Sequence, residues 1–233
     1  MDFELIPLAI SDAAVEVCLL DLSRVHDLEA SAPRFLTGPE QAEYAELQME
    51  RRRREWLGAR VCLKLMAMRL GRIDDPLRCA VVKDPRGRPR LTEAPALASR
   101  VVSDCSLSHK GRFGCAAVSI AAGSSIGVDI EEVSPRLLGL ARAFAHERDV
   151  LLGSRPEEER LAILWALKEA SSKVVGRGLA MGLRSVTCEE TAPGVHRVVA
   201  DGVELSGRHT LHEGYAIALC LGTDPTLGAE PAG

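Results

Sequence analysis

The sequence predicts an α+β fold, because segments with a helical spacing of apolar residues alternate with short extended segments along its 233 residues. Apolar residues make up 46% of the chain and charged residues 27%, a balance that suits a globular protein with a buried core. Each half of the chain follows the same order, with a strand first, helices next and further strands last. The chain divides into residues 1–122 and 123–222, followed by a loose tail at 223–233 that is rich in Gly, Pro and Ala. The repeat between the two halves is too faint to establish a duplication from the sequence alone.

The first half is expected to begin with a strand over residues 14–21. The sequence Thr37-Gly-Pro-Glu40 is a capping box, which predicts the start of a helical stretch that is broken in places and ends at Gly71. Extended segments are then expected at 78–83 and 101–107.

A hairpin is expected at the junction of the two halves, formed by strands over 112–120 and 126–131 and joined by a turn at 121–125. The elements predicted after it are a helix from 135 toward 144, a helix capped at 154–157 that ends near 176, two strands around the turn at 201–202, and a strand over 215–221.

Two segments of the second half carry acidic residues in a pattern that suits a metal ion. In Ile126-Gly-Val-Asp-Ile-Glu131 the apolar residues alternate with Gly127, Asp129 and Glu131. A strand would therefore point the side chains of Asp129 and Glu131 out of the same face. Glu169 and Lys173 lie four residues apart in a predicted helix and share one side of it. Each motif alone also fits an ordinary solvated surface. Together they suit a Mg²⁺-bound pyrophosphate, since Mg²⁺ takes carboxylate and phosphate oxygens.

Two segments of the first half could approach an anion. The segment Lys83–Pro89 combines the turn residues Pro85 and Gly87 with three cations. The segment Ser108–Gly111 offers a hydroxyl, an imidazole and backbone N–H groups. Either could also be an ordinary charged turn, so their occurrence together with the acidic motifs decides the interpretation.

The order of these segments resembles the 4'-phosphopantetheinyl transferase superfamily, and more narrowly its long, surfactin-synthetase-activating type. The resemblance covers roughly residues 50–190. It rests on six motifs, which are Gly87-Arg-Pro89, Ser108-His-Lys-Gly111, Gly127-Val-Asp-Ile-Glu131, Phe144-Ala-His-Glu147, Trp165-Ala-Leu-Lys-Glu-Ala-Ser-Ser-Lys173 and Gly176-Arg-Gly-Leu179. The fold it implies has two similar α+β subdomains in a pseudo-twofold arrangement, with coenzyme A in the cleft between them.

The activity that the resemblance implies is transfer of the 4'-phosphopantetheine arm of coenzyme A to a serine of an apo acyl or peptidyl carrier protein, with release of adenosine 3',5'-bisphosphate. Asp129, Glu131 and Glu169 match the family's ligands for Mg²⁺, which Mn²⁺ could replace. Glu169 also matches the base for the carrier serine, acting directly or through a metal-bound water. Lys173 matches a lysine that contacts the phosphates.

The resemblance also implies the nucleotide contacts. Ser108 and His109 match the pair that binds the 3'-phosphate, and Arg51 is the best match to an arginine on the same phosphate, although Arg52, Arg53 or Arg54 could take its place. The loop around adenine and ribose is matched by Lys83, Arg86, Gly87, Arg88 and Pro89.

Three departures from the commoner family pattern concern these nucleotide contacts. Arg88 stands where lysine is usual, which keeps the positive charge and changes its shape. The run Cys105-Ser-Leu107 replaces an asparagine-containing run, and Lys110 replaces a small residue after the histidine. The reaction class does not depend on these positions.

Composition supports the same class of protein. The net charge of −4 and the isoelectric point near 5.9 argue against a nucleic acid as ligand. The chain has no basic, apolar leader and no long uninterrupted apolar run, so we expect a soluble, cytoplasmic protein without a membrane partner. Its seven cysteines are scattered without a C-x-x-C pair, which predicts reduced, buried thiols. We also expect a monomer, because one chain would supply both walls of the cleft.

Two other classes of function remain open at this point. Clustered carboxylates and lysine also suit another metal-dependent phosphoryl enzyme, such as a nucleotide phosphohydrolase. A non-catalytic module that binds coenzyme A or docks a carrier could share the fold. The sequence does not distinguish fatty acid, polyketide and nonribosomal peptide carriers.

Overall fold

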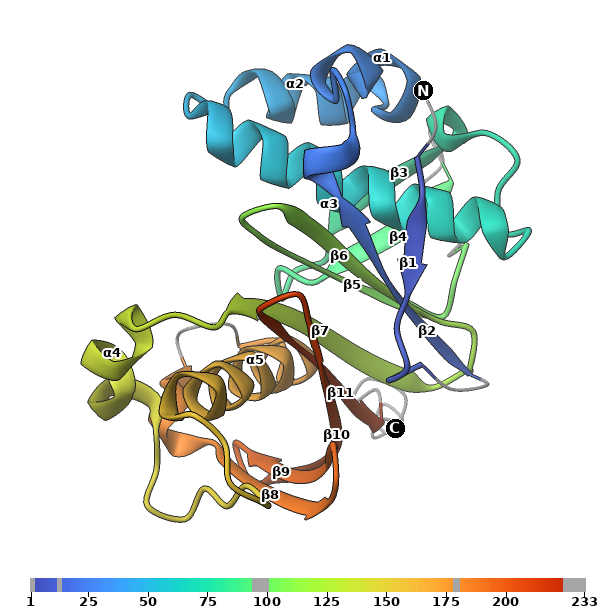
Figure 1. The fold of residues 1–233 in the computed structure, drawn as a ribbon. Coiled ribbons are helices and arrows are strands. Elements are labelled where there is room, and N and C mark those ends of the chain that lie inside the picture. Colours follow the sequence, from blue (N-terminus) through green and yellow to red (C-terminus); the bar gives the residue numbers. More distant parts are fainter. Residues whose placement is uncertain (1–2, 12–13, 94–100, 178–180, 224–233) are drawn as a thin grey trace, which may run out of the picture.

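The computed structural model describes residues 3–11, 14–93, 101–177 and 181–223, and it has a mixed α+β fold (Figure 1). This confirms the predicted fold class. The predicted tail beyond residue 223 and Leu179 of the last motif lie outside the described residues. None of the helices in the described ranges is long and apolar enough to cross a membrane.

Two antiparallel sheets organise the chain. The first has the order β1-β2-β6-β5, with β1 (Leu5–Pro7), β2 (Val15–Asp21), β5 (Asp104–Lys110) and β6 (Phe113–Ser119). The second has the order β7-β11-β10-β9-β8, with β7 (Ser124–Glu132), β8 (Thr187–Ala192), β9 (Val195–Ala200), β10 (Val203–His212) and β11 (Tyr215–Thr223). A separate hairpin joins β3 (Cys79–Lys83) to β4 (Pro89–Glu93).

The α-helices are α1 (Ala32–Phe35), α2 (Gly38–Ala45), α3 (Glu50–Arg69), α4 (Arg136–Phe144) and α5 (Glu157–Val175). Short 3-10 helices occur at Leu22–Arg24, Glu29–Ser31, Pro76–Arg78 and Leu183–Ser185. The break expected in the first helical stretch separates α2 from α3, and the predicted capping box begins α2, where Glu40 accepts a hydrogen bond from the backbone N–H of Thr37 at 3.0 Å. Gly176 ends α5 as expected, in the left-handed conformation at φ 76°.

The two halves repeat one arrangement. In the first half, the last strand, β6, lies between the first long strand, β2, and the preceding strand, β5. In the second half, the last strand, β11, lies in the same way between β7 and β10. A long helix covers each sheet, and each carries a fully buried lysine, Lys64 in α3 and Lys168 in α5. Each lysine ammonium donates to a phenylalanine carbonyl, of Phe35 at 2.6 Å and of Phe144 at 2.8 Å. The three-dimensional arrangement shows a similarity between the halves that is faint in the sequence.

The sheets pack face to face between the two long helices, so the order of layers is helix, sheet, sheet, helix. Alternation within strands produces these layers. In β7, Ile126, Val128 and Ile130 join a core cluster with residues of β2, β6 and β11, whereas Gly127 lies under the backbone of α5. The other face of each sheet forms a separate core with its helix, and all seven cysteines are buried free thiols, as predicted.

Several predicted elements are wrong. The hairpin expected at the junction of the halves does not form, because β6 pairs with β2 and β5 whereas β7 pairs with β11. The apolar face of β7 packs against the first sheet, but in the described part of the chain β7 does not form backbone hydrogen bonds with the strands of that sheet. The extended segment expected at 101–107 is β5, which runs through the Ser-His-Lys motif to Lys110. Pro156, not Ser154, is the N-cap of α5, and the sequence did not predict β1, β4 or β8.

The edge strands β5 and β7 are joined by side chains. Alternate residues of β5 point to β7, as the pleat of a strand requires. Their hydrogen bonds are from Ile126 N to Asp104 Oδ2 at 2.8 Å, from Val128 N to Ser106 Oγ at 3.0 Å, and from Ser108 Oγ to Asp129 Oδ1 at 2.7 Å. This contact brings the Ser-His motif of one half beside the acidic strand of the other.

Gly127 allows α5 to approach β7 closely enough for Lys173 to reach Asp129. A Cβ at Gly127 would collide with the carbonyl oxygen of Ala170. We expect Gly127→Ala to lower the free energy of unfolding by about 1–3 kcal/mol, measured by urea denaturation. The control is Gly139→Ala in α4, where a Cβ meets no atom within 4 Å, and which should not destabilise the protein. Equal stability of the two variants would contradict this account.

Candidate functional site

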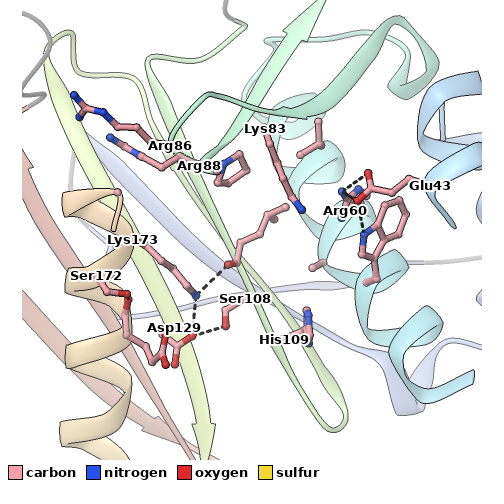
Figure 2. Close-up of a pocket in the computed structure, with 18 of the residues that line it drawn as sticks. Glu43, Arg60, Lys83, Arg86, Arg88, Ser108, His109, Asp129, Ser172 and Lys173 are labelled. Carbon is pink, nitrogen blue, oxygen red and sulfur yellow. Dashed lines mark hydrogen bonds and ion pairs between the residues drawn. The ribbon is translucent and has the colours of Figure 1, made fainter. Parts of the chain in front are cut away.

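A cavity of about 650 Å³ lies where α3, the β3–β4 hairpin, β5, β7 and α5 meet (Figure 2). It brings together most of the residues predicted from the sequence. Those that line it are Lys83, Arg86, Gly87, Arg88, Pro89, Ser108, His109, Asp129, Glu169 and Lys173. Arg51 and Glu131, also predicted, are not among its lining residues.

Asp129 is held by two donors at one end of the cavity. Its Oδ1 accepts hydrogen bonds from Ser108 Oγ at 2.7 Å and from the Lys173 ammonium at 2.8 Å, as Figure 2 shows. The same ammonium donates to the carbonyl oxygens of Val128 at 2.7 Å and Leu107 at 3.2 Å. Lys173 therefore has an acceptor for each of its three protons and ties α5 to both edge strands.

Glu169 projects into the same end of the cavity from α5. Burial raises the pKa of Glu169 to about 7, and the negative charge of Asp129 adds to the rise. No side-chain hydrogen bond to Glu169 occurs within the part of the chain that the structure describes. A carboxylate with this pKa can accept a proton near neutral pH. The excess of negative charge around it also fits a divalent cation, as the predicted Mg²⁺ requires.

Glu131 points to other cations and not into the cavity. The Lys110 ammonium lies 2.7 Å from one of its carboxylate oxygens and 3.0 Å from the other, and Arg136 lies at 3.4 Å. Among the described residues, the carboxylates of Asp129, Glu131 and Glu169 do not form a group whose oxygens all lie within 4.8 Å of one another. The predicted convergence of three carboxylates is thus incomplete in this conformation.

His109 lies between an arginine and a glutamate of α3. Arg52 donates to His109 Nε2 at 2.8 Å, and Glu55 lies 3.3 Å from Nδ1. Burial, and then the charge of Arg52, lowers the pKa of His109, which favours a neutral imidazole at pH 7. Arg51 instead pairs with Glu55 at 3.1 Å and has 69% of its side chain exposed. Arg52, one of the alternatives to Arg51 in the sequence, is therefore the arginine beside His109 and lines the cavity.

The β3–β4 loop forms the cationic wall. Asp84 accepts the backbone N–H groups of Arg86 at 2.9 Å and Arg88 at 3.0 Å, and Gly87 takes φ 78°, a conformation that glycine allows. Lys83 and Arg86 are exposed. Arg88 is buried, and its guanidinium binds the carboxylate of Asp104 rather than facing the solvent in the cavity.

The opposite end of the cavity contains residues that the sequence interpretation missed. The Arg60 guanidinium stacks 3.3 Å from the centre of the Trp56 ring and pairs with Glu43 at 3.3 Å. Arg52, Trp56 and Arg60 are spaced by four residues, so they share one side of α3. That spacing was the available signal, and it was obscured by the neighbouring run of arginines.

A second group of possible metal ligands lies in the C-terminal sheet, on β8, β9 and β10. Ligand atoms of Glu190, His196 and His209 are all within 4.8 Å of one another. Arg155 already neutralises Glu190 at 3.1 Å, and the two imidazoles hydrogen-bond to each other at 2.6 Å. The charge of Glu190 is thus balanced without an ion, whereas His196 Nδ1 is buried without a hydrogen-bond partner among the described residues.

Comparison with known proteins finds a family match in the second half of the chain. Residues 125–220, which include Asp129 of β7 and Glu169 of α5, match the family described as the 4'-phosphopantetheinyl transferase superfamily. The match covers less than half of the chain. This match agrees with the resemblance seen in the motifs at 127–131 and 165–173, which lie inside it.

Two curated relatives carry the same family description. Over 113 residues the chain is 35% identical to the 4'-phosphopantetheinyl transferase psf-1 of Bacillus pumilus, covering 46% of this chain and 44% of the relative. Over 146 residues it is 31% identical to the 4'-phosphopantetheinyl transferase ffp of Bacillus subtilis, covering 58% and 59%. The chain thus matches about half the length of these relatives. The solved structure of holo-[acyl-carrier-protein] synthase (AcpS) of Thermotoga maritima matches 60% of this chain and 77% of that chain, with 24% identity and a TM-score of 0.37.

Proposed function

We propose that this chain transfers the 4'-phosphopantetheine arm of coenzyme A to a serine of an apo carrier protein, as a transferase of the long, surfactin-synthetase-activating type. The observation that carries the proposal is Glu169, a half-buried carboxylate with a pKa of about 7, beside Asp129 in one cavity with a cationic loop. A base poised near neutral pH and cations for phosphates are the two requirements of this reaction.

Coenzyme A would bind along the cavity with its charged groups on the cationic walls. Lys83 and Arg86 are exposed on the loop, and Ser108, His109 and Arg52 lie opposite it, where they would hold the 3'-phosphate. Gly87 and Pro89 shape the loop around the adenine and ribose, and Arg88 supports it from below through Asp104.

The chemical step joins the serine oxygen to the phosphorus nearer the pantetheine arm. The bond from that phosphorus to the bridging oxygen of the pyrophosphate breaks, and adenosine 3',5'-bisphosphate leaves with this oxygen. Glu169 takes the serine proton, and Lys173 holds Asp129 and α5 in place next to the phosphates. When bound, Mg²⁺ or Mn²⁺ would neutralise charge on the pyrophosphate, and Asp129 and Glu169 are the carboxylates that face the cavity and would hold it.

The carrier protein and the assembly state belong to the same proposal. An acyl or peptidyl carrier domain would present its serine at the open side of the cavity. Both halves of one chain line this cavity, through the β3–β4 loop and through α5. A monomer is therefore sufficient for activity.

The direct test is incubation of the purified protein with coenzyme A, Mg²⁺ and a panel of apo carriers from fatty acid, polyketide and nonribosomal peptide systems. Intact-mass spectrometry should show the added arm on at least one carrier. Breakdown of coenzyme A without a mass gain would instead indicate a phosphohydrolase. Binding of coenzyme A with neither change would indicate a non-catalytic module.

A further inference from the structure

Lys110 is the last of four residues on β5 that point to β7. The first three, Asp104, Ser106 and Ser108, form the hydrogen bonds with β7 that are described above. The strand pleat places Lys110 next in this row, and its ammonium reaches both oxygens of Glu131 at 2.7 and 3.0 Å. The position of Lys110 is therefore set by the edge contact between the two sheets.

This ion pair is shielded from solvent. The Glu131 side chain is 4% exposed and the Lys110 side chain 22% exposed, so salt and water screen the pair only weakly. Arg136 adds a second positive charge at 3.4 Å. Asp129 and Glu169 differ from Glu131 because they line the cavity, and Glu169 has no such cation bonded to it in the described part of the chain.

We propose that Lys110 acts as an internal cation that withholds Glu131 from the metal site and so lowers the affinity of the site for a divalent ion. The inference rests on the proposed function, which assigns the metal to this cavity. Asp129 and Glu169 then form a two-carboxylate site. An ammonium and a metal ion compete for the same carboxylate, and the affinity of an oxygen-ligand site rises with the number of its charged ligands. Release of Glu131 from Lys110 would add such a ligand.

The test measures Mn²⁺ binding by electron paramagnetic resonance of the free ion, without coenzyme A or carrier. Lys110→Ser should tighten Mn²⁺ binding by about tenfold, because Glu131 becomes available as a third charged ligand. Glu131→Gln should change the affinity of the otherwise intact protein by less than about twofold, since Glu131 does not bind the ion while Lys110 is present. The double variant should lose the gain and return to the original affinity.

The matched control is Lys83→Ser, which removes a lysine from the other wall of the cavity and leaves Glu131 paired. It should leave Mn²⁺ affinity nearly unchanged. An equal gain in Lys83→Ser would mean that net charge alone sets the affinity and would overturn the inference. So would an unchanged affinity in Lys110→Ser, absence of Mn²⁺ binding in both proteins, or a loss in Glu131→Gln as large as that in Asp129→Asn.

The two proposals can fail separately. Inactivity toward every carrier would overturn the proposed function, whereas the Mn²⁺ titrations involve neither carrier nor coenzyme A. Thermal unfolding of each variant establishes that a change in affinity is measured on folded protein.

Discussion

Replacement of Glu169 by glutamine should lower the rate of arm transfer by about 10²–10⁴-fold. The amide keeps the shape of the side chain but cannot take the serine proton, and it removes a charge that would hold the metal. The rate is measured by intact mass of the carrier at saturating coenzyme A and Mg²⁺. Glu157→Gln, an exposed substitution in the first turn of the same helix, is the control and should act at the original rate. Normal turnover by Glu169→Gln would show that Glu169 is not the base.

The same variant should remain folded. Because burial raises the pKa of Glu169 to about 7, the contribution of this group to stability is present below the unfolded pKa near 4.5 and is lost as the pH rises through about 7. Glutamine cannot ionise. In EDTA at pH 8, Glu169→Gln should therefore be at least as stable to urea as the unaltered protein, and a large loss of stability would attribute its inactivity to unfolding.

Asp104→Asn should lower the free energy of unfolding by about 3–5 kcal/mol, because it leaves the buried Arg88 without its counter-charge and the buried Arg90 with Asp84 alone, at 3.0 Å. Asp104 binds the guanidinium groups of both Arg88 and Arg90 and also accepts the backbone N–H of Ile126 at 2.8 Å. It therefore connects the β3–β4 loop to the first strand of the second half. Loss of this connection should also weaken binding of coenzyme A, which calorimetry can measure on the folded fraction.

The control for Asp104 is Asp74→Asn. Asp74 pairs with Arg78 at 3.5 Å, and its side chain is 79% exposed. An exposed pair of this kind contributes less than about 1 kcal/mol, so urea denaturation should show little change. If the two variants were equally stable, the buried cluster around Asp104 would not be a major support of the loop.

Local patterns in the sequence predicted the elements whose cause is local. The alternation in 126–131 predicted the strand and its two faces, and the capping box at Thr37 predicted the start of a helix. The left-handed cap at Gly176 was also predictable from residue type. The hairpin expected at 112–131 was wrong, because alternation shows that one face of β7 is buried but not which neighbour covers it or which strand pairs with it.

The sequence by itself determined which chemical groups are available to the site, namely acidic residues on a strand and a helix and cations on a turn, and it showed a resemblance to a family. The tertiary structure alone decided which of these side chains meet. In the structure, Arg52 rather than Arg51 contacts His109, Arg88 pairs with Asp104, and Glu131 pairs with Lys110. These pairings depend on how two sheets and two helices pack, and packing sets side-chain distances that the order of residues along one strand or helix does not contain.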